Sequence, residues 1–144
     1  MIIFRVVNIT NEILNTFEQL IPQLTKTVPP PTQDELQTLI AFEGSVLLAA
    51  RQEQGRPILG VATVSLVRAP TGVHARLEDV VVDEAARGQG VGAALTEAAI
   101  VVAREWGANY LALTSNPHRE AANKLYQKLG FKHWETNVYR FDIE

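Results

Sequence analysis

The sequence predicts a mixed α/β domain built around one sheet, and three features of the 144-residue chain lead to that prediction. Short β-branched runs alternate with longer segments whose apolar residues recur at helical spacing. Turns that contain glycine or proline separate these runs. The composition, 47% hydrophobic and 20% charged, is that of an ordinary globular protein. A chain of this length suits one domain, so we expect residues 1–144 to fold as a single domain.

The first elements expected are a strand and two helices. The run from Ile2 to Val7 is short, apolar and β-branched, which favours a strand. Thr10 can cap a following helix, whose apolar stripe extends from Ile13 to Leu24. Three consecutive prolines then stop that helix. Thr32 and Glu35 have the spacing of a capping box, which predicts a second, shorter helix.

Three strands in a meander are expected next, in β-rich runs that turn-forming residues separate. They cover Ser45 to Arg51, Ile58 to Arg68 and His74 to Val82. A helix over Gly90 to Trp106 follows. It is apolar around most of its circumference, so we expect it to be largely buried.

The last third of the chain is predicted to contain three strands and one helix. Tyr110 to Thr114 has the pattern of a short buried strand, and Arg119 to Leu129 that of a helix that ends at Gly130. Phe131 to Trp134 and Asn137 to Phe141 predict two final strands. The expected order of elements is therefore β-α-α-β-β-β-α-β-α-β-β.

Charge and composition exclude several classes of function. The net charge of −3 provides no field that would draw the chain onto nucleic acid. There are no cysteines for disulfides or thiolate chemistry, and the three histidines lack metal-ligand spacing, so no metal is expected. No apolar run reaches the roughly 18–20 residues of a membrane helix, and the start has no signal-peptide pattern. We expect a cytoplasmic protein without nucleic-acid or membrane partners.

The most informative segment joins a buried strand, through a loop, to the start of a helix. Val80, Val81 and Val82 end the strand, and the loop leads into Arg87-Gly88-Gln89-Gly90-Val91-Gly92. Alternate glycines let the backbone approach a ligand closely and adopt conformations that other residues avoid. The first turn of a helix has unpaired N–H groups and a positive dipole end, which favour a bound phosphate. Arg87 adds a positive charge, so we expect this turn to hold a pyrophosphate.

Two other interpretations of this turn compete with a pyrophosphate site. One is a glycine-rich helix start that only packs closely against the sheet. The other is a dinucleotide site, because Gly88, Gly90 and Ala93 satisfy its G-x-G-x-x-A pattern. However, five residues separate the strand from Gly88, whereas the dinucleotide turn is tight. The acidic ribose ligand expected about 20 residues later is missing, and only one βαβ unit could follow. These observations exclude the dinucleotide interpretation.

Two segments of the chain resemble motifs of the GCN5-related N-acetyltransferase (GNAT) superfamily. The family turn is Gln or Arg, two residues, Gly, one residue, then Gly or Ala, and Arg87 to Gly92 matches it. The second family pattern is matched by Ala122-Asn123-Lys124-Leu125-Tyr126-Gln127-Lys128-Leu129-Gly130-Phe131, at the right separation. The specific match covers Glu78 to Phe131, and the N-terminal third agrees only in the order of its elements.

The resemblance implies a single mixed, mostly antiparallel sheet, splayed between its fourth and fifth strands and flanked by helices. Acetyl-CoA would enter the splay as the acyl donor. Its pantetheine would pair with backbone groups of Val80, Val81 and Val82, and its pyrophosphate would accept N–H bonds from the turn Arg87 to Gly92. The acyl thioester would then lie beside Tyr126.

The later helix supplies the remaining candidates for contact with the cofactor. Many members of the family carry an asparagine seven residues before the tyrosine, where this chain has Arg119. Asn116, at the end of the preceding strand, is a substitute for it, so both residues are candidates. Arg119, Asn123 and Tyr126 are spaced i, i+4 and i+7 and therefore share one helical face.

Amide formation requires a neutral amine, a polarised thioester carbonyl and a protonated leaving thiol. Tyr126 is the natural general acid, although its reference pKa of about 10 lies above the roughly 8.5 of a thiol. Its O–H can still stabilise the developing thiolate by donating a hydrogen bond. The alternative for Tyr126 is a core tyrosine that packs beside Leu125 and Leu129.

A base must deprotonate the incoming ammonium, directly or through water. Glu78 and Asp79 are adjacent carboxylates on an otherwise apolar strand and point to opposite faces, so one is expected to face the substrate. We choose Glu78 narrowly over Asp79; the alternative is that both lie at a solvated strand start. A backbone N–H near Val81, freed by the splay or a bulge, is expected to stabilise the oxyanion.

These residues predict an N-acetyltransferase that moves an acetyl group from acetyl-CoA to a primary amine by direct attack in a ternary complex. The acceptor is a small molecule or a protein amine. The alternative is a non-catalytic acyl-CoA-binding or sensory module on the same fold, which would need neither Tyr126 nor the pair Glu78 and Asp79. A homodimer formed through Phe131 to Phe141 is also compatible with the sequence.

Overall fold

The computed structural model describes residues 1–144, which form two units, Met1–Thr114 and Ser115–Glu144. The N-terminal unit contains all the strands and the first three α-helices, and the C-terminal unit contains the last helix. Both clusters of buried apolar side chains belong to the N-terminal unit, which therefore carries the core.

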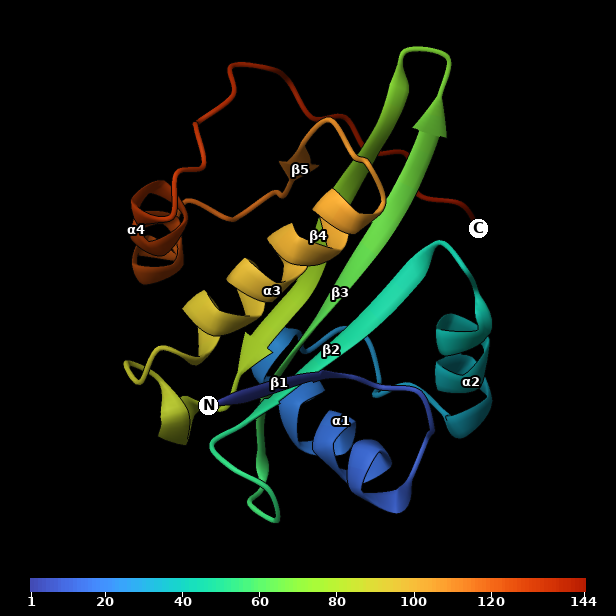
Figure 1. Cartoon of the computed structure of the whole chain (residues 1–144), viewed down its shortest axis with the longest axis vertical. Coiled ribbons are helices and arrows are strands. Elements are labelled where there is room, and N and C mark those ends of the chain that lie inside the picture. The colour runs from blue at the N-terminus through green and yellow to red at the C-terminus, as the bar shows by residue number, and fades with distance from the viewer. The chain divides into compact units, whose positions relative to one another are not determined.

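A five-stranded sheet forms the centre of the N-terminal unit, and its strands lie side by side in sequence order (Figure 1). The strands are β1 (Ile2–Arg5), β2 (Ser45–Arg51), β3 (Ile58–Ala69), β4 (Gly72–Val82) and β5 (Leu111–Ala112). Neighbours from β1 to β4 are antiparallel, whereas β5 is parallel to β4. The predicted mixed and mostly antiparallel sheet is therefore confirmed.

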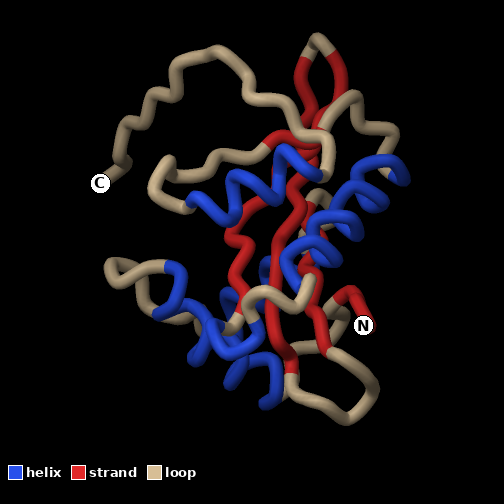
Figure 2. Tube along the Cα trace, turned by 90° about the vertical axis from the view of Figure 1, so that its left-hand side faces the viewer, coloured by secondary structure: helices blue, strands red, loops and turns tan.

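Helices cover both faces of this sheet. Helices α1 (Asn11–Leu24) and α2 (Gln33–Ala41) pack on one face and α3 (Val91–Glu105) on the other, as Figure 2 shows from the side. A single turn of 3₁₀ helix, η1 (Glu84–Ala86), leads from β4 toward α3. The site predicted from the glycine motif thus lies at the junction of the sheet with the helix that covers one face.

Two apolar cores result, one on each face of the sheet. Leu20 of α1 packs in one core with strand residues such as Leu47 and Val61. On the other face, Leu95 of α3 packs in a core that includes Leu48. Successive residues of a strand alternate between the cores because side chains point to opposite faces with period two. The predicted burial of α3 holds for the side that faces the sheet, where Leu95 is fully buried, whereas Val101 is 49% exposed.

Two helices begin with the side-chain caps that the sequence predicts. Thr10 Oγ1 accepts a hydrogen bond from the Ile13 N–H at 3.2 Å. The capping box at α2 is complete: the Glu35 N–H donates to Thr32 Oγ1, and the Thr32 N–H donates to Glu35 Oε1. The bond from the Thr32 N–H, and secondarily the Thr32 side chain, lower the pKa of the Glu35 carboxyl. The caps fix where α1 and α2 start and hence how each meets the sheet.

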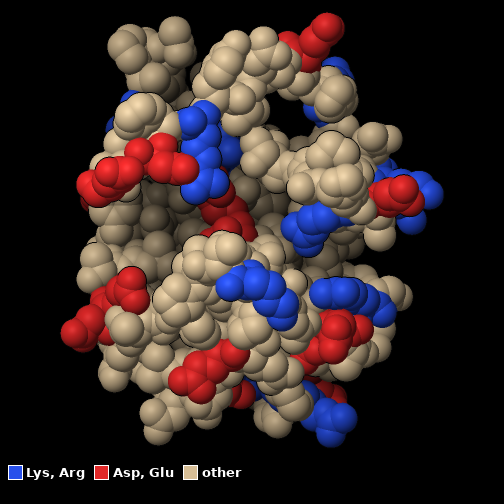
Figure 3. Space-filling model, turned by 180° about the vertical axis from the view of Figure 1, so that it is seen from behind, with Lys and Arg blue, Asp and Glu red and all other residues tan.

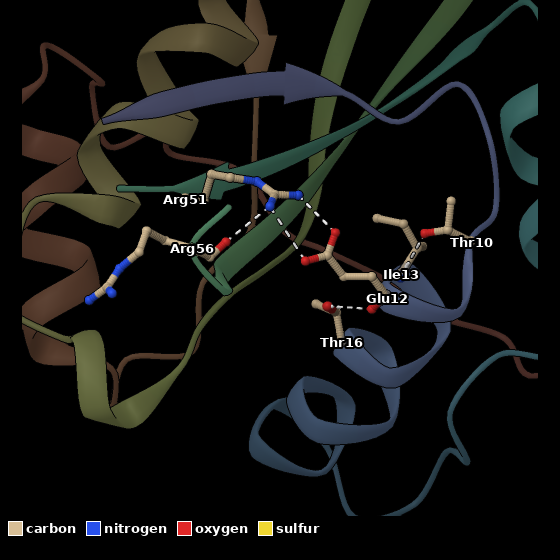
Figure 4. Close-up of polar contacts among 6 residues, drawn as sticks. All are labelled: Thr10, Glu12, Ile13, Thr16, Arg51 and Arg56. Carbon is tan, nitrogen blue, oxygen red and sulfur yellow. Dashed lines mark hydrogen bonds and ion pairs between the residues drawn. The ribbon is translucent and has the colours of Figure 1, made fainter. Parts of the chain in front are cut away.

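Arg51, the last residue of β2, joins three other segments (Figure 4). Its guanidinium donates to both carboxylate oxygens of Glu12, from Nη2 at 2.9 Å and from Nη1 at 3.4 Å. Nη1 also donates to the Arg56 carbonyl at 3.0 Å, and the guanidinium lies 5.0 Å from the centre of the Phe4 ring. Only 13% of the Arg51 side chain is exposed. This side chain therefore ties α1, β1 and the β2–β3 turn together.

The C-terminal unit consists of α4 (Glu120–Lys128) and the segments on either side of it. The predicted helix is confirmed, and Gly130 follows it with the left-handed φ of 101° that is typical of a helix end. The prediction of two final strands, Phe131 to Trp134 and Asn137 to Phe141, is wrong, because residues 129–144 form no strand. An apolar alternation supplies the side-chain pattern of a strand, but a strand also needs a neighbour to pair its backbone.

One face of the molecule carries interspersed charges of both signs. On the face that Figure 3 shows, acidic and basic side chains alternate with uncharged ones and form no large patch of a single sign. This distribution agrees with the small net charge of −3. No helix combines the length and the apolar character that crossing a membrane requires.

Replacing Arg51 by methionine keeps much of the apolar stem but removes the bonds to Glu12 and to the Arg56 carbonyl. We expect the free energy of unfolding to fall by about 1–2 kcal/mol, since the Arg51 donor of a charged hydrogen-bond network is lost, while the half-exposed Glu12 remains in contact with water. Urea unfolding followed by circular dichroism measures the change. Arg56→Met is the matched control, because Arg56 enters the network through its backbone. Equal losses in the two variants would contradict the role of Arg51.

Candidate functional site

The predicted pyrophosphate turn connects η1 to α3 and is exposed from Arg87 to Gly90. Gly88 and Gly90 have φ of 79° and 83°, in the left-handed region that favours glycine. Gly90 is the N-cap of α3, and no side chain caps this helix. The first N–H groups of α3 therefore lack a side-chain acceptor, which is the condition under which a helix start binds an anion.

Buried residues on both sides attach the turn to the core. Ala86 and Val91 are 3% and 1% exposed, respectively, and belong to the core beneath α3. Helix α3 begins very close to β3: a Cβ on Gly60 would lie 3.1 Å from side-chain atoms of Val91 and Leu95. It would also lie 3.0 Å from the Val81 carbonyl oxygen. The missing side chain at Gly60 thus lets the first turn of α3 rest directly on the sheet.

A β-bulge interrupts β4 just before its three consecutive valines. Glu78 pairs with Thr63 and Val81 pairs with Val61, which leaves two residues of β4 opposite one residue of β3. One of the two, Asp79, has a φ of 51°, the only positive value outside glycine. Residues other than glycine rarely adopt this left-handed backbone conformation, so the pairing on either side of the bulge must hold Asp79 in it.

The bulge reverses the face that later side chains of β4 occupy. Before it, Leu77 belongs to the core beneath α3. After it, Val80 and Val82 pack against that same core, while Val81 belongs to the core beneath α1. An uninterrupted strand would place Leu77 and Val81 on one face. The hypothesis of an oxyanion-binding N–H near Val81 requires a local irregularity of this kind.

Strands β4 and β5 separate after a short parallel contact. Their ladder consists of Ala75 with Leu111 and Arg76 with Ala112. Beyond Arg76 no strand pairs with that edge of β4, so the segment that ends in Val80–Val82 has one edge without a neighbouring strand. The predicted splay between the fourth and fifth strands is therefore present.

The two candidate bases have different surroundings. Arg76, two residues earlier on β4, donates from Nε to Glu78 Oε1 at 2.8 Å. Asp79 lies on the bulge, where desolvation raises the pKa of its carboxyl and the neighbouring charge of Glu78 raises it further. Glu78 is thus the partner of a cation, and Asp79 is the carboxyl with increased proton affinity.

In the C-terminal unit, three predicted cofactor residues organise the start of α4. Asn116 Oδ1 accepts a hydrogen bond from the His118 N–H at 3.0 Å. The Asn116 carbonyl accepts from the Arg119 N–H at 3.0 Å and from the side-chain amide of Asn123 at 3.1 Å. Arg119 is the exposed N-cap of the helix. Asn116 and Asn123 therefore have a structural role that the sequence did not indicate.

Tyr126 is the buried residue of α4, with 8% of its surface exposed. Its ring packs edge-to-face on Phe131, with the ring centres 5.8 Å apart. Burial raises the pKa of its phenol, and the positive charge of Arg119 offsets this only in part. Tyr126 therefore stays protonated at neutral pH, and its O–H is able to donate a hydrogen bond.

The predicted site residues divide between the two units. Those of the strand and the glycine turn lie on one continuous stretch, Glu78 to Gly92, of the N-terminal unit, and the other four lie in the C-terminal unit: Asn116, Arg119, Asn123 and Tyr126. Sequence reasoning missed Arg76, although the i, i+2 spacing to Glu78 on a strand indicates a shared face. No group of three or more histidine or acidic side chains is placed to hold a metal ion.

Comparison with known proteins identifies the family. The sequence profile of the acetyltransferase (GNAT) family matches residues 12–131, which is most of the chain. The chain belongs to the GNAT acetyltransferase family. The resemblance drawn from two motifs is thereby confirmed, and the match extends into the N-terminal helices, where the sequence alone offered only an element pattern. No curated protein sequence matches the chain.

Solved structures show the same GNAT fold along the whole chain. A Trypanosoma brucei acetyltransferase is 27% identical, with a TM-score of 0.76 and 98% of each chain covered. A protein of Agrobacterium tumefaciens assigned as an acetyltransferase is 24% identical, with a TM-score of 0.82, and covers 99% of this chain and 100% of its own. An aminoglycoside 6′-N-acetyltransferase of Acinetobacter haemolyticus is 20% identical, with a TM-score of 0.77, covering 100% and 99%.

We expect the pKa of Asp79 to lie above the ordinary aspartate value of about 3.9. In the Glu78→Gln variant the pKa of Asp79 should fall, because the adjacent negative charge is removed. The folded chain binds this proton more tightly than the unfolded chain, so ionised Asp79 costs stability above its folded pKa, and the cost disappears as the pH falls. Carbon-13 NMR of the carboxyl against pH measures both values. Glu97→Gln, on α3, is the control; an ordinary pKa in the wild type would contradict the expectation.

Proposed function

We propose that this GNAT protein is an N-acetyltransferase that moves an acetyl group from acetyl-CoA to a primary amine in a ternary complex. The observation that carries the proposal is the exposed turn at the uncapped start of α3, with left-handed backbone at Gly88 and Gly90. The family profile includes this turn and most of the chain. A pyrophosphate suits the turn because both the unpaired N–H groups and the helix dipole favour anions.

The proposed path of acetyl-CoA follows the elements that meet at the turn. The Arg87 guanidinium and the N–H groups from Gly88 to Gly92 would bind the pyrophosphate. The edge of β4 at Val80–Val82 has no neighbouring strand, so its backbone can pair with the two amides of pantetheine much as a strand would. The extended pantetheine would then carry the thioester toward the bulge at Asp79.

The reaction forms one bond and breaks one. The amine nitrogen attacks the thioester carbonyl carbon, the carbon–sulfur bond breaks, and the nitrogen loses one proton while the sulfur gains one. A backbone N–H at the bulge near Val81 is proposed to bind the oxyanion that forms during the attack. Tyr126 is proposed to donate a hydrogen bond to the departing sulfur. Because burial raises the pKa of Tyr126, its phenol keeps the proton and stabilises the thiolate by donating a hydrogen bond. Solvent then protonates the thiolate.

The proposed base is one of the two carboxylates on β4. A base removes a proton most effectively when its pKa lies close to the working pH. The raised pKa of Asp79 therefore favours it over an ordinary carboxyl. Glu78, our first choice from the sequence, already accepts a hydrogen bond from the Arg76 guanidinium on Oε1, so this oxygen is occupied. We therefore propose Asp79, directly or through water, with Glu78 increasing its proton affinity.

The acceptor is proposed to be an amine that approaches from the side of α1 and α2. The segment Pro29 to Gln33 connects these helices and is proposed to border the acceptor pocket. One structural relative is an aminoglycoside 6′-N-acetyltransferase, which makes aminoglycosides one reasonable class in an amine panel. Transfer to any member of the panel would also distinguish an enzyme from the alternative, a non-catalytic acyl-CoA-binding module.

Acetyl-CoA titrated into the protein by calorimetry tests the cofactor site. We expect a micromolar Kd, which corresponds to about −8 kcal/mol, and loss of binding in an Arg87→Ala/Gly90→Glu double variant. The variant removes a cation and places a carboxylate and a side chain on the turn. Arg104→Ala, in the last turn of α3, is the matched control. A folded wild type that fails to bind would rule out acetyl-CoA as the donor.

Tyr126→Phe tests the leaving-group role. Once an acceptor is known, we expect kcat to fall by about 100-fold, because the hydrogen bond to the thiolate forms only as the carbon–sulfur bond breaks. The Kd for acetyl-CoA should remain close to that of the wild type. Tyr139→Phe, at an exposed tyrosine, is the control. An unchanged kcat in Tyr126→Phe would assign this residue to packing alone.

A further inference from the structure

Two glutamines of α1 hold the segment that leads into the pyrophosphate turn. The Gln19 side-chain amide donates from Nε2 to Asp83 Oδ2 at 2.6 Å. One helical turn later, Gln23 Oε1 accepts a hydrogen bond from the Glu84 N–H at 2.9 Å. The partners are 64 and 61 residues apart in the sequence, so these bonds add polar contacts between two distant segments that also share the core beneath α1. We call Gln19, Gln23, Asp83 and Glu84 the glutamine clasp.

Each member of the clasp also makes a second bond. Gln23 Nε2 donates to the Gln19 carbonyl at 3.3 Å, so both ends of its amide are used. Asp83 Oδ1 accepts from the Ala85 N–H at 3.2 Å and thereby starts η1, while the Asp83 N–H donates to the Leu59 carbonyl at 2.8 Å. The carboxylate of Asp83 therefore joins α1 on one oxygen and η1 on the other.

The position of the clasp determines what it can affect. It binds the first residues after β4, and η1 then leads directly into Arg87 and the glycine turn. The far end of η1 is held from the other face of the sheet, because Ala86 is buried in the core beneath α3. The segment between β4 and α3 is thus held from both faces of the sheet, and on the α1 side it is held by hydrogen bonds from side chains.

We infer that Gln19 and Gln23 are positioning residues for the binding of the acetyl-CoA pyrophosphate. This inference rests on the proposed function. An exposed hydrogen bond contributes only about 0.5–1.5 kcal/mol to stability, so the clasp adds little to the fold as a whole. A turn that binds an anion through several N–H groups, however, depends on their mutual geometry, and small displacements weaken such binding. The clasp restricts the turn to the arrangement that these N–H groups require.

The clasp also connects the cofactor turn with the helix that leads into the proposed acceptor pocket. Gln23 lies in the last turn of α1, and the α1–α2 connector begins two residues later. Because coupling between two sites is reciprocal, order imposed on the turn by acetyl-CoA also stabilises the end of α1.

The test compares Gln19→Met, Gln23→Met and the double variant with Gln37→Met. Methionine preserves length and helix propensity but removes the amide, and Gln37 is an exposed glutamine of α2 outside the clasp. Calorimetry gives the Kd for acetyl-CoA, and NMR titration gives the Kd for S-acetylpantetheine, which lacks the pyrophosphate. We expect a rise of about 3–10-fold in the acetyl-CoA Kd of the double variant, the equivalent of one lost hydrogen bond, and no change for S-acetylpantetheine.

Other outcomes separate the inference from the proposed function. If the wild type binds acetyl-CoA and the double variant binds it equally well, the inference is overturned and the proposed function is not. A parallel loss of affinity for both ligands indicates a general disturbance and also overturns the inference. If the wild type does not bind acetyl-CoA, both fail. Gln19→Lys, which keeps a donor opposite Asp83, should retain the wild-type Kd if the clasp acts as described.

Discussion

The early end of the ladder between β4 and β5 is the constraint on which the candidate site depends. Two residue pairs join these strands, and after Arg76 that edge of β4 has no neighbouring strand. Backbone N–H and C=O groups in a largely apolar setting require partners. In a continuous sheet the next strand would supply them; here the open edge is free for an extended ligand with amide groups. The glycine turn follows this edge after the single turn of η1, and the edge and the turn together are the path that we propose for acetyl-CoA.

The bulge at Asp79 links that open edge to the chemistry. One extra residue moves Val81 to the face beneath α1 and Val80 and Val82 to the face beneath α3, which keeps all three valines packed. The cost is a left-handed aspartate in the middle of the strand. Its carboxyl is thereby placed beside Glu78 in a partly desolvated position. A single irregularity of the backbone thus sets both the proposed oxyanion donor and the proposed base.

The sequence predicts most of the N-terminal unit because its signals are local. The capping box of Thr32 and Glu35 depends on neighbouring residues alone, and the strand from Ser45 to Arg51 has a local β-rich pattern bounded by turn residues; both are as predicted. The two final strands were expected from the residues of the runs themselves, which say nothing about a pairing partner. The left-handed Asp79 and the bond between Gln19 and Asp83 had no local signal either, since each depends on residues distant in sequence. Prediction therefore fails where a long-range contact decides the structure.

The glycine turn limits substitution through handedness and not through volume. Neither Gly88 nor Gly90 has an atom within 4 Å of the place where a Cβ would stand, so ordinary side chains have room there. What excludes them is the sign of φ, which an L-residue adopts only under strain. Gly60 presents the opposite case, because its backbone would suit any residue while three neighbouring groups occupy the space. Larger residues are therefore excluded before α3 by the left-handed backbone of Gly88 and Gly90, and beneath α3 by the lack of space around Gly60.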